Sequence, residues 1–253
     1  MTAIRTPLIL AAALAVACLT SLSPAARPGS AEHGFALVEL FTSEGCSSCP
    51  PADALLGRIV AEAERGHLAV YALAYHVDYW DHLGWRDRFS SPEYTQRQDG
   101  YAREFGLTSL YTPQMVVNGE RQFVGSNESA ARAAIRDGLA RTDAVLITLS
   151  ARSASPEVVV DCTAAAAPAG VRLEIGWVDD HATSSPDRGE NGGRTLHHVH
   201  VVRELQRVPL DGKHHASATL HPPDPGQGRV IAWLEARDGG RVLGATESEP
   251  IRR

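Results

Sequence analysis

The fold is decided by one stretch of the sequence, LVELFTSEGCSSCPP, which spans Leu37 to Pro51. Its first half is an apolar run bounded by Ser, Glu and Gly, and such a run is typical of a strand buried on both faces. Apolar residues then recur at helical spacing over residues 54–63. We therefore predict a buried strand, a short turn and a helix that begins at Cys46 and Cys49.

The start of a helix is a position that makes a cysteine reactive. Unpaired backbone N–H groups and the positive end of the helix dipole stabilise a thiolate over a thiol. We expect Cys46 to be the more acidic and more exposed sulfur, with Cys49 one turn inside. Pro50 and Pro51 suit a first turn, because the N–H groups that they lack have no intrahelical partner there.

A CxxC pair allows three interpretations. A zinc half-site needs a second ligand pair, and the sequence has no second CxxC and no HxxxH. A structural disulfide across four residues removes little entropy from the unfolded chain. A redox-active pair is favoured where strands and helices alternate around it. The sequence favours the redox pair, in which the disulfide itself takes the place of a cofactor. Metal binding is the open alternative.

Length and charge limit the class of protein. The 253 residues suffice for one large or two ordinary globular domains. Lys and Arg number 24 against 30 Asp and Glu, which gives a net charge of −6. Basic residues do not cluster with aromatic ones, so nucleic-acid binding is not expected.

Residues 1–26 have the layout of a secretory signal peptide. Arg5 lies in a short positive end, and an apolar run from Leu8 to Leu22 precedes small residues at 23–26. The run is too short for a membrane span, so none is expected in the mature chain. Lipid attachment at Cys18 is the alternative, since LAVAC resembles a lipoprotein processing site. Either outcome predicts a secreted or periplasmic protein, in a compartment where disulfides persist.

The chain to residue 142 alternates strands and helices. After a strand at residues 68–75, Ser91 before Pro and Glu predicts a helix start. Asn118-Gly119 is a strong hairpin signal, and a helix follows from about residue 127. This order predicts a mixed sheet flanked by helices.

Aromatic, His and Asp side chains are dense in residues 76–87. They follow a predicted parallel strand, and α/β folds bind ligands at the carboxyl ends of such strands. His76, Asp78 and His82 are therefore candidate metal ligands. The alternative is a surface loop whose rings pack inward while their polar ends face water.

The order of elements over residues 33–142 resembles the thioredoxin fold. Cys46 and Cys49 match its active-site pair, and Thr112-Pro113 matches its cis-proline loop. The resemblance implies catalysis by the two cysteines. It also implies that Thr112 and Pro113 contact an extended substrate peptide through the backbone.

The chain departs from thioredoxin at several positions. Gly45 replaces the family's Trp, and Ser47-Ser48 replaces its Gly-Pro. Thioredoxins have a buried acid six residues before the first cysteine, whereas Glu39 lies seven before it. A shift of one residue reverses the side of a strand, so Glu39 as proton acceptor for Cys49 is a hypothesis.

Several phrases also resemble the secreted bacterial family called domain of unknown function 1223 (DUF1223). They are ELFTSEGCSSCPPAD at residues 39–53, HVDYWD at 76–81, YTPQ at 111–114 and Asn118-Gly119. This resemblance covers nearly the whole mature chain. It implies a fold but no substrate, since the family has none established.

Residues 145–253 predict an all-β, sandwich-like second domain. Its expected strands are Val145–Ser150, Val158–Cys162, Val171–Val178, Thr195–Leu205, Ala216–Leu220, Val230–Ala236 and Val242–Thr246. Residues 179–194 predict a long exposed loop. Alternation along a strand puts His198 and His200 on one face, where copper or zinc could bind, although isolated surface histidines are commoner.

Two functions follow from these patterns. The first is a thiol–disulfide oxidoreductase that acts through Cys46 and Cys49 on a protein or small-thiol disulfide, with an unidentified redox partner. The alternative is an extracytoplasmic binding module for a metal such as copper, or for a protein partner, with a non-catalytic thioredoxin fold.

Overall fold

The structure is a computed structural model that describes residues 34–224, 226–236 and 240–253. The predicted signal peptide at residues 1–26, with Cys18, lies outside them. No helix in the described ranges is long and apolar enough to cross a membrane. The elements up to residue 142 are β1 (Ala36–Thr42), α1 (Pro50–Gly66), β2 (Val70–His76), the 3-10 helix η1 (Asp78–Trp80), α2 (Pro92–Glu104), β3 (Gln114–Val117), β4 (Arg121–Val124) and α3 (Glu128–Leu139).

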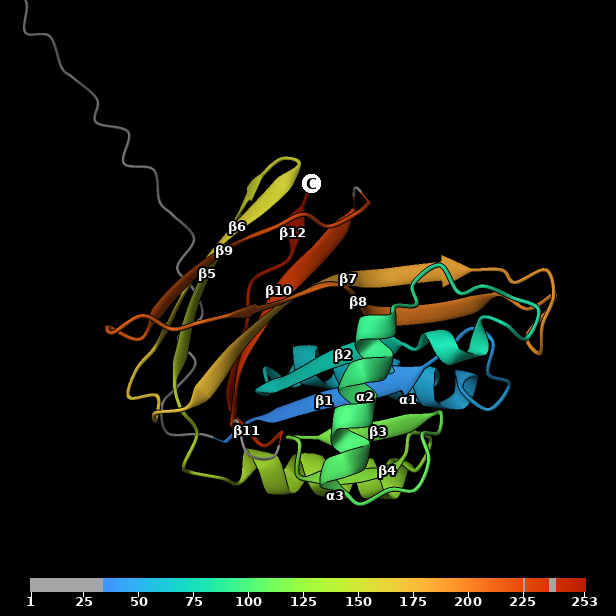
Figure 1. The fold of residues 1–253 in the computed structure, drawn as a ribbon, viewed down its shortest axis with the longest axis horizontal. Helices are drawn as coiled ribbons and strands as arrows, with labels where there is room; N and C mark the ends of the chain where they lie inside the picture. The colour runs from blue at the N-terminus through green and yellow to red at the C-terminus, as the bar shows by residue number, and fades with distance from the viewer. Residues whose placement is uncertain (1–33, 225, 237–239) are drawn as a thin grey trace, which may run out of the picture.

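The rest of the described chain is built from strands. They are β5 (Ile147–Ala154), β6 (Glu157–Ala164), β7 (Val171–Ser184), β8 (Leu196–Val208), β9 (His215–Leu220), β10 (Gln227–Ala236), β11 (Val242–Glu247) and β12 (Ile251–Arg252). Every strand predicted here from the sequence is present. Figure 1 shows the two parts of the chain side by side.

One mixed sheet runs through both parts of the chain. Its strand order is β11-β10-β7-β8-β2-β1-β3-β4, and β12 also pairs with β10. β1 is parallel to β2 and antiparallel to β3. The two parts join where β2 and β8 pair in parallel, at Ala74 and Val201. The sheet therefore crosses the domain boundary that we predicted between residues 142 and 145.

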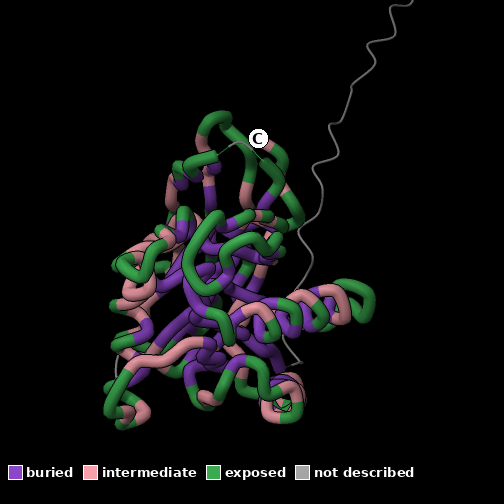
Figure 2. Tube along the Cα trace, turned by 90° about the vertical axis from the view of Figure 1, so that its right-hand side faces the viewer, coloured by how far each residue is buried: buried purple, intermediate pink, exposed green. Residues whose placement is uncertain are grey.

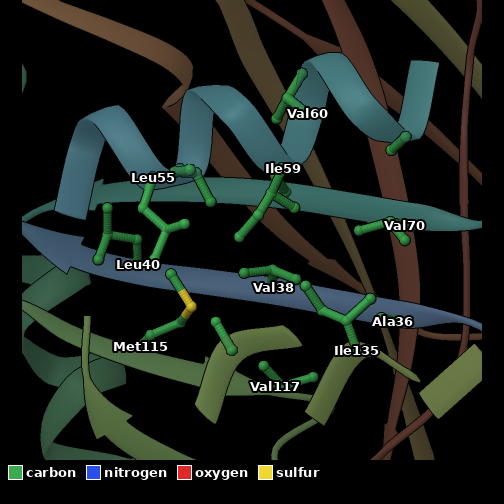
Figure 3. Close-up of a cluster of buried hydrophobic side chains, with 14 of the residues drawn as sticks. Ala36, Val38, Leu40, Leu55, Ile59, Val60, Val70, Met115, Val117 and Ile135 are labelled. Carbon is green, nitrogen blue, oxygen red and sulfur yellow. The ribbon is translucent and has the colours of Figure 1, made fainter. Parts of the chain in front are cut away.

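Helices cover both faces of the first half of this sheet. Successive side chains of a strand point to opposite faces. Val38 and Leu40 of β1 thus share a core with α1 and α3, and Figure 3 shows Leu55 and Ile59 of α1 pointing toward them. Side chains on the other face of β1 pack with aromatic residues of α2, which crosses the near face of the sheet in Figure 1.

A second, antiparallel sheet has the order β5-β6-β9. Its apolar face packs against β7 and β10 around Trp177, which is fully buried. Three strands of the second half thus form a small second layer, whereas the other strands of the predicted sandwich-like domain extend the mixed sheet. Figure 2 shows buried positions in the interior of the molecule and exposed positions at its periphery.

Local sequence signals account for several element ends. The Ser91 hydroxyl accepts a hydrogen bond from the Glu93 N–H at 3.2 Å and caps α2. The Asn127 side chain likewise accepts from the Ala130 N–H at 3.1 Å at the start of α3. The turn between β3 and β4 has positive φ at Asn118 and Gly119, as its hairpin signal predicts.

The prediction of an exposed loop at residues 179–194 is wrong in part. β7 continues to Ser184, because its pairing with β8 extends to Ser184 and Leu196. Asn191, in the remaining connection, is fully buried. Composition indicated a polar loop but not what the loop covers.

Candidate functional site

Cys46 and Cys49 form a disulfide at the start of α1, with 5.4 Å between their Cα atoms. The Cys49 N–H donates to the Cys46 carbonyl oxygen at 3.2 Å, which closes a tight turn. Cys49 is the N-cap residue of α1, and Pro50 and Pro51 occupy the first helical positions. The predicted turn, the helix start and the pairing of the two sulfurs are therefore present.

The disulfide is enclosed, which corrects our expectation of an exposed Cys46. Both cysteines have 0% exposure. We call residues 185–194, which connect β7 to β8, the cover segment. The Asn191 side-chain amide donates to the carbonyl oxygens of Glu44 and Cys46, both at 2.9 Å. The Ser47 N–H donates to a carboxylate oxygen of Glu190 at 2.9 Å.

Trp80 links the cysteine turn to the predicted substrate loop. Its indole Nε1 donates to the Thr112 hydroxyl oxygen at 2.9 Å. A Cβ atom on Gly45 would lie 3.0 Å from the Trp80 Cβ. Since real Cβ atoms rarely approach so closely, Trp80 explains why the residue before Cys46 is a glycine.

Pro113 lies beside the first turn of α1. The Thr112–Pro113 peptide bond is cis. The backbone N–H of Gly125 donates to the Pro113 carbonyl oxygen at 2.9 Å. A Cβ atom on Gly125 would lie 3.1 Å from the Pro113 Cβ and 3.2 Å from the Ala52 Cβ. Pro113 is therefore a close neighbour of Ala52, in the first turn of α1. The structure thus brings Thr112 and Pro113 to the disulfide end of the sheet.

Glu39 has a different environment from the one our hypothesis required. Its carboxylate accepts from Arg97 Nε at 2.6 Å and from the Tyr101 hydroxyl, both on α2. Helix α1, whose N-cap residue is Cys49, packs against the opposite face of β1. This corrects the expectation for Glu39. Its carboxylate belongs to an ion pair beneath α2, on the side of the strand that the one-residue shift predicts.

The candidate metal ligands do not gather in one place. Asp78 accepts from the Thr95 hydroxyl at 2.5 Å, and His82 is exposed. His200 is buried with Nδ1 3.2 Å from the Ala72 carbonyl oxygen. His76 and His198 do meet, with ring centroids 4.8 Å apart. No group of three or more His, Cys, Asp or Glu in the described ranges has the arrangement of a metal site.

A buried polar cluster lies behind the cysteine turn, and we call it the acid–histidine cluster. Its members are Glu44, Asp53, His76, Asp87 and His198. His76 Nδ1 and Asp87 Oδ2 are 2.6 Å apart in a fully buried pair. His198 Nε2 is 3.7 Å from Glu44 Oε1, and its Nδ1 is 3.9 Å from Asp53 Oδ2. Two imidazoles and three carboxyl groups thus share one enclosed volume.

Asp53 connects this cluster to the disulfide. It lies four residues after Cys49, and residues at this spacing share one face of a helix. The Asp53 N–H donates to the Cys49 carbonyl oxygen at 3.1 Å. Its carboxylate accepts from the Thr42 hydroxyl at 2.9 Å. Asp53 therefore places a carboxyl group one turn behind the inner cysteine.

Burial shifts the acid–base properties of the cluster. Loss of hydration raises the pKa of Asp53 to about 7. Burial also raises the pKa of Glu44, to which the charge of Asp87 adds. Burial lowers the pKa of His198 to about 3, and neighbouring His76 adds to this effect. His198 is therefore neutral at neutral pH.

The His76–Asp87 pair has the opposite character. Burial alone would lower the pKa of His76, but the charge of Asp87 and their hydrogen bond raise it above its ordinary value. Burial alone would raise the pKa of Asp87, yet His76 and the N–H groups of Glu44 and Phe89 lower it. This pair is an ion pair, so it places a positive charge beside His198.

Comparison with known proteins identifies the family. The model of the family described as protein of unknown function (DUF1223) matches residues 37–234. The chain belongs to the DUF1223 family. No curated protein matches the chain.

Two solved structures resemble this DUF1223 protein over most of its length. The crystal structure of protein AGR_C_4864 from Agrobacterium tumefaciens is 29% identical, with a TM-score of 0.61. The match covers 84% of this chain and 93% of the A. tumefaciens chain. HBP35 of Porphyromonas gingivalis is 15% identical, with a TM-score of 0.59, and covers 86% of this chain and 75% of that one. The second likeness concerns the fold alone.

Sequence reasoning missed most acids of the cluster in this DUF1223 protein. Asp53 had a signal, because it lies four residues after Cys49 in the first turn of a helix, but we interpreted that turn only for its cysteines and prolines. Glu44 and Asp87 lie in connections, and no periodicity predicts their burial. The contacts of Asn191 and Glu190 with the cysteine turn could not be predicted from the sequence, because they join residues more than 140 positions apart.

Proposed function

We propose that this DUF1223 protein carries out thiol–disulfide exchange outside the cytoplasm through Cys46 and Cys49, on a thioredoxin-like unit built from β1 to α3. The observation that carries the proposal is the disulfide at the N-terminus of α1, with Pro113 beside the first turn of that helix. A helix N-terminus stabilises the thiolate that such exchange requires. The sequence of residues 1–26 supports the compartment.

The reaction with a dithiol substrate proceeds in two substitutions. A substrate thiolate attacks Cys46 Sγ, the bond to Cys49 breaks, and Cys49 leaves as a thiolate. The second substrate thiolate then attacks the substrate sulfur of the mixed disulfide and releases Cys46 as a thiolate. The substrate is oxidised to a disulfide and the cysteine pair is reduced. The reverse sequence reduces a substrate disulfide.

The substitution that releases Cys49, and its reverse, need proton transfer at Cys49. When Cys49 leaves, the carboxyl group of Asp53 supplies its proton, and in the reverse direction Asp53 removes that proton. A pKa near the working pH suits a group that must both give and accept. Burial raises the pKa of Asp53 to about 7, which supports this role. Asp53 takes the place that we first gave to Glu39.

The substrate must displace part of the cover segment, because both sulfurs are enclosed. The Glu190 contact with the Ser47 N–H is exposed at the surface, so water competes with it. Asn191 is the stronger attachment, since its buried amide holds two carbonyl oxygens. Opening at Glu190 frees the Ser47 N–H, next to Cys46 in the chain.

An insulin-reduction assay with dithiothreitol tests the proposed function. We expect turnover by the wild-type protein and by Cys162→Ala, which removes a cysteine from the core around Trp177. Cys46→Ser should lose turnover, since it removes the attacked sulfur. Equal rates for Cys46→Ser and wild type, or no wild-type turnover in this assay, would overturn the proposal.

A further inference from the structure

The hydroxyl of Ser48 is the one side-chain group in the described ranges that hydrogen-bonds a sulfur of the disulfide. Its Oγ lies 3.4 Å from Cys46 Sγ. A disulfide sulfur carries no hydrogen, so the hydroxyl donates and the sulfur accepts. Ser48 is exposed, whereas Cys46 has 0% exposure, so water cannot take the place of this donor. The contact therefore distinguishes Cys46 from Cys49.

The backbone N–H groups in the first turn of α1 are not free to stabilise a thiolate. Pro50 and Pro51 occupy the first helical positions and have no N–H group. The N–H groups of Ala52 and Asp53 both donate to the Cys49 carbonyl oxygen, at 2.8 and 3.1 Å. The helix dipole remains, but the direct donors that usually accompany it at a helix start are absent or already bonded.

The N–H groups between the two cysteines are mostly bonded as well. The Ser47 N–H donates to a carboxylate oxygen of Glu190 at 2.9 Å. The Cys49 N–H donates to the Cys46 carbonyl oxygen at 3.2 Å. Within the described residues this leaves Ser48 as the residue of the turn with unused donors, and its hydroxyl already contacts Cys46 Sγ.

Charged groups near the cysteine turn do not supply a net positive charge. They are Glu44, Asp53, Glu190 and Arg194, with the His76–Asp87 pair behind them. Arg194 donates to the Asn191 side-chain oxygen at 2.9 Å. Burial lowers the pKa of His198 to about 3, so this ring adds no charge at neutral pH. Even with Glu44 and Asp53 protonated, the two remaining acids balance the two cations.

We propose that the Ser48 hydroxyl stabilises the Cys46 thiolate and thereby shifts the cysteine pair toward oxidising substrate dithiols. This inference rests on the proposed function. A hydrogen bond to an ionised acceptor is roughly twice as strong as one between neutral groups. The bond from Ser48 therefore strengthens when the disulfide is reduced and Cys46 becomes a thiolate. Stabilisation of the reduced form makes the cysteine pair a stronger oxidant.

Ser48 acts at the step that releases Cys46. The second substrate thiolate attacks the substrate sulfur of the mixed disulfide, the bond to Cys46 Sγ breaks, and its electron pair stays on Cys46. The Ser48 hydroxyl keeps its hydrogen, so no proton moves at this sulfur. Asp53 by contrast gives a proton to Cys49, and the pair ends as one thiolate and one thiol. In the reverse direction, Ser48 holds the thiolate that attacks the substrate disulfide.

The first test measures the thiolate of Cys46 in the reduced full-length protein. Alkylation of Cys46 by iodoacetamide is followed against pH, with the labelled peptide identified by mass spectrometry. Ser48→Ala should contain about tenfold less thiolate at a pH below both titration midpoints, because it loses a charge-assisted hydrogen bond. Ser48→Thr keeps a hydroxyl and should match wild type. The midpoint does not depend on how easily the reagent reaches Cys46, so it separates charge from access.

The second test measures the direction in which the cysteine pair is shifted. Each protein is equilibrated with mixtures of reduced and oxidised glutathione at a pH above both titration midpoints. The equilibrium constant for reduction of the Cys46–Cys49 disulfide should fall about tenfold in Ser48→Ala and stay at the wild-type value in Ser48→Thr. Ser126→Ala, at an exposed serine between β4 and α3, is the surface control and should match wild type.

Equal titration midpoints for Ser48→Ala and wild type would overturn the inference. So would a Ser48→Thr variant that behaves like Ser48→Ala, because the hydroxyl would then not be the group that matters. The Ser48 side chain is exposed, so each variant should fold, and circular dichroism checks this. Failure of the proposed function is distinguishable, because it removes insulin turnover from the wild type, whereas neither of these measurements requires turnover.

Discussion

Asp53 is the residue on which the proposed chemistry depends most after the cysteines. Its pKa rises from an ordinary 3.8 to about 7 on folding. The folded protein then binds this proton more tightly than the unfolded chain, so wild-type stability falls as pH rises from about 4 to about 7. The carboxyl group is thus destabilising in the pH range where its proposed role requires it.

We predict that Asp53→Asn stabilises the protein at pH 8 and slows insulin reduction. Asn cannot ionise, so the gain in unfolding free energy should be on the order of a few kcal/mol at pH 8 and shrink toward pH 4. Urea unfolding at both pH values measures it. Asp99→Asn, on the exposed side of α2, is the control and should show no such pH dependence. A variant less stable than wild type at pH 8 would contradict the assignment.

Among single residues, the cysteines could be predicted from the sequence, but Asp53 as their neighbouring acid could not. The alternation on β1 was readable, and it already set Glu39 apart from the thioredoxin pattern. The pairing of Glu39 with Arg97 was not readable, because the two lie 58 residues apart. His198 was noticed for metal binding, whereas its surroundings, known only from the fold, are two carboxyl groups and a charged histidine.

Among the elements, the cover segment contacts the cysteine turn through Glu190 and Asn191. The hydrogen bonds of Glu190 with Ser47 lower the pKa of its carboxyl group. The contact is therefore present above that lowered pKa and is lost as pH falls through it. Access to Cys46 should follow the same dependence.

We predict that Glu190→Ala speeds reduction of the disulfide by dithiothreitol several-fold at pH 7. Removal of the carboxylate frees the Ser47 N–H and loosens the cover segment. Stopped-flow measurements should show the variant and wild-type rates converging at acidic pH. Asp187→Ala, an exposed change in the same segment, is the control. A rate equal to that control at pH 7 would show that the Glu190 contact does not limit access.

Most individual elements were predictable because their signals are local. Caps at Ser91 and Asn127 and the Asn118-Gly119 hairpin each depend on residues within a few positions. The length of β7 was not predictable, because its last residues are mostly polar and none of residues 181–184 is buried. Local composition cannot distinguish such a strand from a loop.

For the whole molecule, one core joins the two parts of the chain. Phe41 and Tyr75 from the first part share a cluster with Val202, Ile231 and Trp233 from the second. The guanidinium of Arg97 lies 5.3 Å from the Trp233 ring centre. The sequence indicated two units because its pattern changes near residue 145, but a pattern along the chain does not reveal that β8 pairs with β2.

We predict that Trp233→Ala lowers the unfolding free energy by about 3–5 kcal/mol. Because the shared core and sheet couple both parts, far-ultraviolet circular dichroism and thiol reactivity of Cys162 should shift together in urea. Val124→Ala, at a residue with 51% exposure, is the control and should change stability by no more than about 0.5 kcal/mol. Two separate transitions, with only one displaced, would instead support independent domains.

The contact between Asn191 and Cys46 has a consequence for biosynthesis. The two residues are 145 positions apart, and a chain is made from its N-terminus. During synthesis, Cys46 and Cys49 therefore emerge well before Asn191 does. An oxidant can reach the nascent thiols freely at that stage, whereas the finished protein admits only partners that displace what has closed over them.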